Sequence, residues 1–171
     1  MEPISIGLAL GSAVVMPLAK HLLDKAASPE NVAKGVAWVW SAAEHFLKVR
    51  RGQASPDEPA AAPPAAPPEE TSTAAPRIRT DIDDFTFKLL SSQVDNLMKR
   101  VETHMGNLQH VLQQAAQYGG EEFAPIVVVN QIKLQRQSIV ECLDELASLM
   151  NQVYGVQVEG VDKLKEALAA A

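Results

Sequence analysis

The most regular pattern of apolar positions lies in the second half of the chain. Between residues 87 and 118, apolar side chains recur at alternating spacings of three and four, the period of a helix that packs along a coiled-coil seam. The segment Thr80–Asp83 resembles a capping box and predicts the start of this helix, and Gly119 and Gly120 predict its end. The seam positions of this first arm are Phe87, Leu90, Val94, Leu97, Val101, His104, Leu108 and Val111.

A second run of the same period follows, with Pro125 expected in its first turn and Gly155 at its end. Its first residues, Ile126–Val129, are β-branched and locally favour a strand. The seam continues downstream without a turn signal, so we expect a helix instead. The seam positions of this second arm are Ile132, Ile139, Leu146, Leu149 and Val153.

Residues 77–171 therefore predict a long, antiparallel, coiled-coil-like helical hairpin with a short last helix over residues 161–169. Two helices alone leave apolar positions beside the seam uncovered. We therefore expect this hairpin to assemble into a four-helix dimer or a higher bundle, or to bind a protein partner. The seam residues of both arms are the candidate oligomer contacts.

At the other end of the chain, residues 4–19 predict a helix that carries no charge and is apolar on every side. Such a helix has to be enclosed by other copies, by the rest of the chain, by a partner or by lipid. The segment is shorter than the ~20 residues that cross a bilayer, and Pro17 interrupts it, so docking or reversible insertion is favoured over a permanent span. Gly7 and Gly11 form a GxxxG pair that permits close helix approach. The membrane- or partner-binding residues expected here are Ile4, Gly7, Leu8, Gly11, Val15 and Leu18.

A second helix is predicted from Ser28 and Pro29, which suit the N-cap and first helical positions. It carries one apolar stripe, two tryptophans and a basic end. Indole rings beside cations suit a membrane interface with anionic lipid. Alternatively, the tryptophans cap the core of an N-terminal hairpin, and the cations interact favourably with the negative C-terminal end of the helix dipole. The membrane- or partner-binding residues expected in this helix are Trp38, Trp40, Lys48, Arg50 and Arg51.

Between these two parts, residues 53–76 hold seven of the eleven prolines and no large apolar side chain. A segment of this composition cannot bury enough surface to offset its ordering entropy, which predicts a disordered spacer. The chain is therefore expected to be all-α, with an apolar N-terminal helical hairpin over residues 1–52, a linker over 53–76 and the long hairpin over 77–171.

The charge divides unevenly between these parts. The whole chain carries a net charge of −6, but residues 1–52 hold six basic and four acidic side chains. The mildly negative net charge of the whole chain argues against a nucleic-acid binder. One cysteine among 171 residues excludes a disulfide framework and a Cys-rich zinc site. It also fits a reducing compartment, so we expect a cytoplasmic protein, peripheral to the inner face of the membrane where it binds lipid.

Few residues in the sequence are candidates for catalysis or metal binding. His104 lies on the first seam and could stack, sense pH or bind metal, although a core-facing histidine is more often satisfied by a neighbour. Cys142 lies on the second seam without basic neighbours and suits a small packing residue. No acid, base and nucleophile can be combined from the sequence, so we expect no catalytic residue, no metal and no cofactor.

The opening Met1–Ser5 segment, the Gly/Ala-rich apolar helix and the following Trp- and Lys-bearing helix resemble a known class of domain. Over residues 1–51 they look like the HeLo-like and Bell-type membrane-active domains of programmed-death effectors. The resemblance implies a helical protein that oligomerises on a signal and pushes its first helix into a membrane, in antiviral or incompatibility responses.

Two functional expectations follow. The first is a non-enzymatic, self-associating helical protein whose N-terminal hairpin docks to or inserts in a membrane, as a defence effector would. The alternative is a soluble helical scaffold or adaptor that binds protein partners through both modules.

Overall fold

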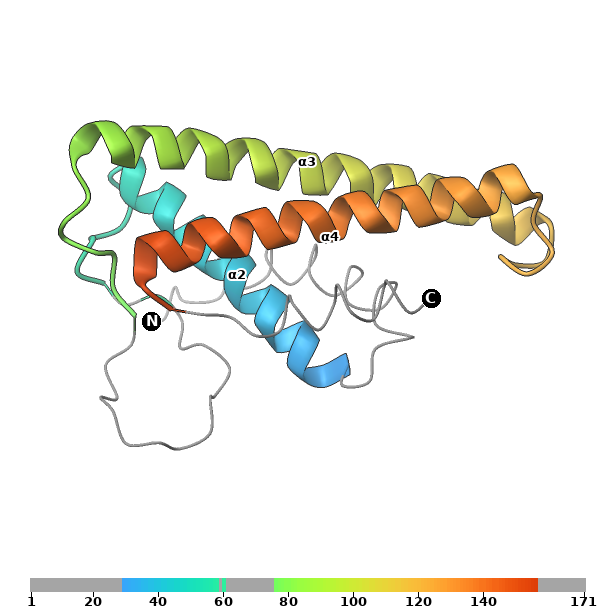
Figure 1. The fold of residues 1–171 in the computed structure, drawn as a ribbon, viewed down its shortest axis with the longest axis horizontal. Helices are drawn as coiled ribbons and strands as arrows, with labels where there is room; N and C mark the ends of the chain where they lie inside the picture. The colour runs from blue at the N-terminus through green and yellow to red at the C-terminus, as the bar shows by residue number, and fades with distance from the viewer. Residues whose placement is uncertain (1–28, 59, 61–75, 157–171) are drawn as a thin grey trace, which may run out of the picture.

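A computed structural model gives the fold of residues 29–58, 60 and 76–156. Three helices account for most of this part: α2 (Pro29–Arg50), α3 (Asp84–Gln117) and α4 (Ile126–Tyr154). α3 and α4 lie side by side and run in opposite directions as a long rod, and α2 crosses that rod obliquely near one end (Figure 1). The prediction of an all-α chain is confirmed over these residues. The helices expected over residues 4–19 and 161–169 lie outside them.

The start of α3 differs from its prediction. Asp83, not Thr80, is the N-cap: its carboxylate accepts hydrogen bonds from the Thr86 N–H (2.9 Å) and the Thr86 hydroxyl (2.7 Å). These hydrogen bonds lower the pKa of Asp83, the side-chain bond most strongly. Because Thr86 supplies a hydroxyl beside its own free N–H, Asp83 gains two donors, which favours the later start.

The other helix ends follow local sequence signals. The N–H groups of Gly119 and Gly120 donate to the carbonyls of Ala116 and Ala115, a Schellman motif that positive φ at both glycines permits. Pro125 lies one residue before α4 rather than within its first turn.

α4 keeps its helical form through the β-branched start, and it ends at Gly155, which has a φ of 70°. The predicted helical state of Ile126–Val129 is therefore confirmed, and so is the stop at Gly155.

The predicted seam is buried within a single chain. Periodic apolar residues of α3 and α4 face each other, as a spacing of three and four requires. The buried seam residues are Leu90, Val94, Leu97, Val101, Leu108, Val111, Ile132, Ile139, Leu146 and Val153. Phe87, His104 and Leu149 are half-buried. An assembly that used these residues as its interface would have to separate α3 from α4.

α2 shares this core. Trp38, Val39 and Trp40 are all buried although they are consecutive, and consecutive positions lie about 100° apart around a helix. The Phe46 and Phe87 rings meet edge to face with centroids 4.8 Å apart, which joins α2 to the start of α3. The part of the predicted N-terminal module that the structure describes is thus packed on the long helix pair.

The proline-rich segment does not hold these parts at a distance. The Ala60 N–H donates to the Pro76 carbonyl at 3.0 Å, so the two ends of the segment between them are adjacent. The Arg79 N–H then donates to the Val153 carbonyl at 2.9 Å, which ties the entry to α3 onto the end of α4. Disorder was predicted over residues 53–76, and of these residues 59 and 61–75 lie outside the described part.

Candidate functional site

A polar cluster lies inside the contact between α2 and the end of α4. His45 Nδ1 and the Tyr154 hydroxyl are 2.9 Å apart, and that hydroxyl donates to the Ala42 carbonyl at 3.2 Å. The Trp38 ring meets the Tyr154 ring edge to face, with centroids 6.3 Å apart. The cluster is therefore a hydrogen-bonded connection between residues that are 109 positions apart in the sequence.

The hydrogen-bond pattern assigns the proton of the imidazole. The Tyr154 hydroxyl has one proton and gives it to the Ala42 carbonyl, so it accepts from Nδ1–H of His45. The other ring nitrogen, Nε2, is buried without a hydrogen-bond partner among the described residues. A proton on Nε2 would make it a buried, charged donor with no acceptor, which is costly. The ring is therefore neutral in this arrangement.

Burial sets the ionisation of both groups. It lowers the pKa of His45, which the Glu58 carboxylate opposes and the Lys48 ammonium reinforces. Burial also raises the pKa of the Tyr154 phenol well above its ordinary range. Because burial disfavours the protonated form of His45 in the folded chain, the cluster is a structural connection that acid weakens.

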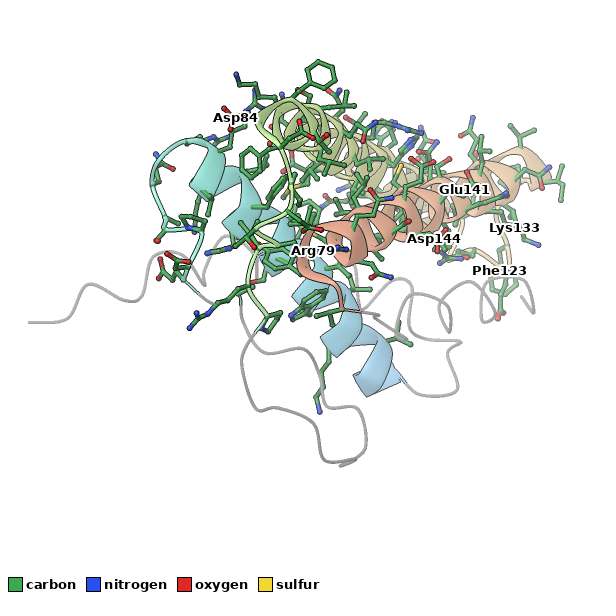
Figure 2. The ribbon with its side chains drawn as sticks, turned by 60° about the vertical axis from the view of Figure 1, so that its left-hand side comes forward. Arg79, Asp84, Phe123, Lys133, Glu141 and Asp144 are labelled. Atoms are coloured by element: carbon green, nitrogen blue, oxygen red, sulfur yellow. The ribbon has the colours of Figure 1, made fainter. Side chains whose placement is uncertain are left out.

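The second feature is an exposed apolar surface at the turn between α3 and α4, which we call the apolar tip. Its side chains are exposed by 52% (Tyr118), 72% (Phe123), 70% (Ile126), 63% (Val127) and 58% (Leu134). Figure 2 shows Phe123 at this end of the rod and Lys133, Glu141 and Asp144 farther along α4. Five large apolar side chains over 17 consecutive residues form a surface of the kind that marks an interaction site.

The turn that carries the apolar tip is held in place by charge. Arg136 donates from Nη1 to Glu121 Oε2 at 3.0 Å and from Nη2 to Glu121 Oε1 at 2.5 Å. This bidentate pair is partly buried, with the arginine side chain 19% exposed. It fixes the turn between α3 and α4 against the third turn of α4, so the tip is presented on a defined backbone.

The structure distributes the predicted membrane- or partner-binding residues unequally. Trp38 and Trp40 are 3% and 2% exposed, so in this arrangement their rings are core residues and do not reach a lipid interface. The cations at the end of the same helix are exposed, at Lys48, Arg50 and Arg51. The expected contacts at Ile4, Gly7, Leu8, Gly11, Val15 and Leu18 lie outside the described residues.

The two residues considered for chemistry have ordinary surroundings. His104 Nδ1 lies 2.8 Å from Gln135 Oε1, a hydrogen bond across the α3–α4 seam. Cys142 is buried, and burial raises the pKa of its thiol, which favours packing over reactivity. Within residues 29–58, 60 and 76–156, no three His, Cys, Asp or Glu side chains are grouped so that they could hold a metal ion.

Comparisons with known proteins identify no relative of this chain. No family model matches the chain, and no curated protein or solved structure is similar to it. Among the described helices, none is long and apolar enough to cross a membrane.

Sequence reasoning missed both features, for different reasons. The cluster of His45 and Tyr154 has no local signal, because the partners come from different helices. The tip had a signal: Phe123, Ile126 and Val127 are apolar residues around the turn that do not belong to the seam. Residues left over from a seam pattern are candidates for a second surface.

Proposed function

We propose that this chain is a non-enzymatic, self-associating helical protein that works by binding. The observation that carries the proposal is the apolar tip, because the seam and the tryptophans are covered within one chain and the tip is not. Exposed apolar surface in a chain with a closed core is a binding surface. The protein would use it to assemble, while residues 4–19 dock to or insert in a membrane.

The membrane part of the proposal is supported by two observations. Residues 4–19 carry no charge, and Lys48, Arg50 and Arg51 are exposed at the end of α2. Cations near a surface attract anionic lipid by about 1 kcal/mol each. The tryptophans do not support it, because they are buried, so the insertion step would belong to residues 4–19 alone. The protein would then be cytoplasmic and peripheral to the inner face of the membrane, and the resemblance of residues 1–51 to programmed-death domains suggests a defence effector.

Flotation of the full chain with vesicles tests lipid binding. We expect flotation with vesicles that contain an anionic lipid, and weaker flotation at high salt. Changing Lys48, Arg50 and Arg51 together to Gln should reduce it. The matched control changes three exposed cations of α3, Lys88, Lys99 and Arg100, to Gln and should leave flotation unchanged.

A second pair of variants tests insertion. Leu8→Glu with Val15→Glu should abolish flotation but leave the oligomer measured by light scattering intact. Flotation that survives these two changes would contradict a membrane role for residues 4–19.

The alternative function is a soluble scaffold or adaptor. It is favoured by the burial of Trp38 and Trp40, which removes the aromatic anchors that a membrane interface would use. A lipid-indifferent dimer of the full chain, seen by light scattering without detergent, would favour this alternative. The partner would then be a protein bound at the apolar tip.

A further inference from the structure

We propose that a second copy of this chain binds at the apolar tip, with the first turns of the two α4 helices crossing antiparallel about a two-fold axis at Asn130. The inference rests on the proposed self-association and assigns to it a surface and a geometry. It differs from the seam assembly expected from the sequence, because the seam stays closed within each copy.

The outward face of α4 has the spacing that such a contact needs. At 3.6 residues per turn, Val127, Asn130 and Leu134 fall within about 60° of one another, on the side opposite the buried residues. Their separations of three and four repeat the pattern of a helix–helix seam. This second seam is short, because the same face continues as Gln137 and Glu141.

A two-fold axis at Asn130 makes this short seam self-complementary. In an antiparallel pair, Val127 of each copy lies opposite Leu134 of the other, so each leucine covers the valine it faces. Asn130 meets its own counterpart on the axis. A single amide among apolar neighbours is a known way to set the register of two helices.

The size of the surface also favours a second copy. The five side chains of the apolar tip expose on the order of 500 Å² per chain, the upper end of what a monomer leaves uncovered. Complete burial of two such surfaces would cover about 1,000 Å², which is the smallest area of a specific interface. A weak, concentration-dependent dimer is therefore expected.

Opposite charges at this end of the molecule favour a second copy. The turn carries the carboxylates of Glu121 and Glu122, and Lys133 is exposed nearby on α4. Glu121 is neutralised by Arg136, whereas Glu122 is exposed. In the antiparallel pair, the exposed Lys133 of one copy faces the first turn of α4 in the other copy, on the side of Glu122.

Two variants test the surface on the full chain. Leu134→Glu should raise the dimer dissociation constant at least ~10-fold in light scattering or sedimentation, because it places a carboxylate in an apolar contact. The matched control is Leu89→Glu, at a leucine of α3 that is 50% exposed against 58% for Leu134. The control should change the constant less than about two-fold. Circular dichroism establishes that both variants keep their helices.

A cysteine pair tests the geometry independently. Asn130→Cys places two thiols on the proposed axis, where facing helices bring Cα atoms within the reach of a disulfide. Mild oxidation should give a covalent dimer. Asn107→Cys, at an exposed position of α3, is the control and should stay monomeric on a denaturing gel.

The possible outcomes distinguish this inference from the proposed self-association. A chain that is monomeric at every concentration overturns the proposed self-association and this inference with it. A dimer that ignores Leu134→Glu, together with no preference for crosslinking at Asn130→Cys, overturns the inference but leaves self-association standing. A monomer whose flotation with vesicles is lost in Leu134→Glu assigns the tip to lipid and overturns the second copy.

Discussion

At the scale of single residues, the contact between His45 and Tyr154 is the least expected feature of this protein. The phenol bridges an imidazole and the Ala42 carbonyl inside an otherwise apolar contact between α2 and α4. A buried polar group left without a partner is costly, so each member of the cluster depends on the others. Two predictions follow at this scale.

Tyr154→Phe should lower the free energy of unfolding by about 1–2 kcal/mol, because it leaves His45 Nδ1 without its partner and removes the hydroxyl that donates to the Ala42 carbonyl. Urea denaturation measures the change. Tyr118→Phe is the matched control: its ring is exposed, so the effect should stay below about 0.5 kcal/mol. Equal effects of the two substitutions would contradict a structural role for the buried hydroxyl.

Acid should destabilise the fold partly through His45. Its pKa is lowered in the folded chain, so the unfolded chain binds the proton more readily once the pH falls below about 6.5. This contribution to stability is therefore complete above pH ~6.5 and is lost as the pH falls, until the folded chain is protonated as well.

Comparison with a variant isolates this contribution from the carboxylates that titrate at lower pH. The loss of unfolding free energy between about pH 7.5 and pH 5.5 should be larger for the wild-type chain than for His45→Asn. The substitution His110→Asn, on the exposed face of α3, should keep the wild-type loss. A wild-type loss that His45→Asn reproduces in full would exclude His45 as its source.

At the scale of the elements, helix ends obey short-range chemistry. Gly155 closes α4 with a φ of 70°, a region that costs about 1–2 kcal/mol for a residue with a Cβ. Gly106 lies in the middle of α3 with open space around it, where glycine only weakens the helix. The two glycines therefore have opposite effects on stability.

Replacing each glycine by alanine separates these effects. Gly155→Ala should destabilise the chain by about 1 kcal/mol, and Gly106→Ala should stabilise it by about 0.5–1 kcal/mol. No side chain lies within 4 Å of a Cβ built at either position. The added methyl group therefore makes no new packing contact that would contribute to the difference. Thermal unfolding followed at 222 nm measures both. Shifts of the same sign would refute the backbone explanation.

Element boundaries also show where local reasoning is limited. The seam of α3 and α4 was predictable because a period of three and four is encoded in neighbouring residues. The start of α3 was placed at Thr80 because a Thr-x-x-Asp spacing resembles a capping box. The cap is Asp83, because Thr86 offers that carboxylate both an N–H and a hydroxyl. Several residues here can cap the helix, and the choice between them depends on which side chain finds donors three residues later.

At the scale of the whole molecule, α2 and the α3–α4 rod share one core. The Phe46–Phe87 and Trp38–Tyr154 ring pairs connect α2 to both long helices. The hydrogen bond from Ala60 to Pro76 brings the ends of the proline-rich segment together beside them. Composition alone suggested two modules on a spacer, because a proline-rich segment does not reveal whether its ends meet.

This shared core predicts a single unfolding transition. Both tryptophans lie on α2, so their fluorescence follows α2, whereas circular dichroism is dominated by the 34 and 29 residues of α3 and α4. The two signals should give the same midpoint in urea. Midpoints that differ by more than the experimental error would indicate that α2 unfolds separately and that the chain consists of two modules.

The sequence by itself determined which described segments are helical, the ends of α3 and α4 at Gly119 and Gly155, and the residues of the seam. These properties depend on residues within a turn or two of each other, so a linear pattern contains them. Only the tertiary structure decided that Trp38 and Trp40 are covered, that His45 meets Tyr154 and that Phe123, Ile126 and Val127 stay exposed. The first two outcomes depend on how α2 crosses the rod, and the third depends on α2 lying at the end of the rod away from the turn between α3 and α4. The crossing is set by contacts between residues that are tens of positions apart in the sequence. The sequence around each of these residues does not indicate which partner its side chain will contact.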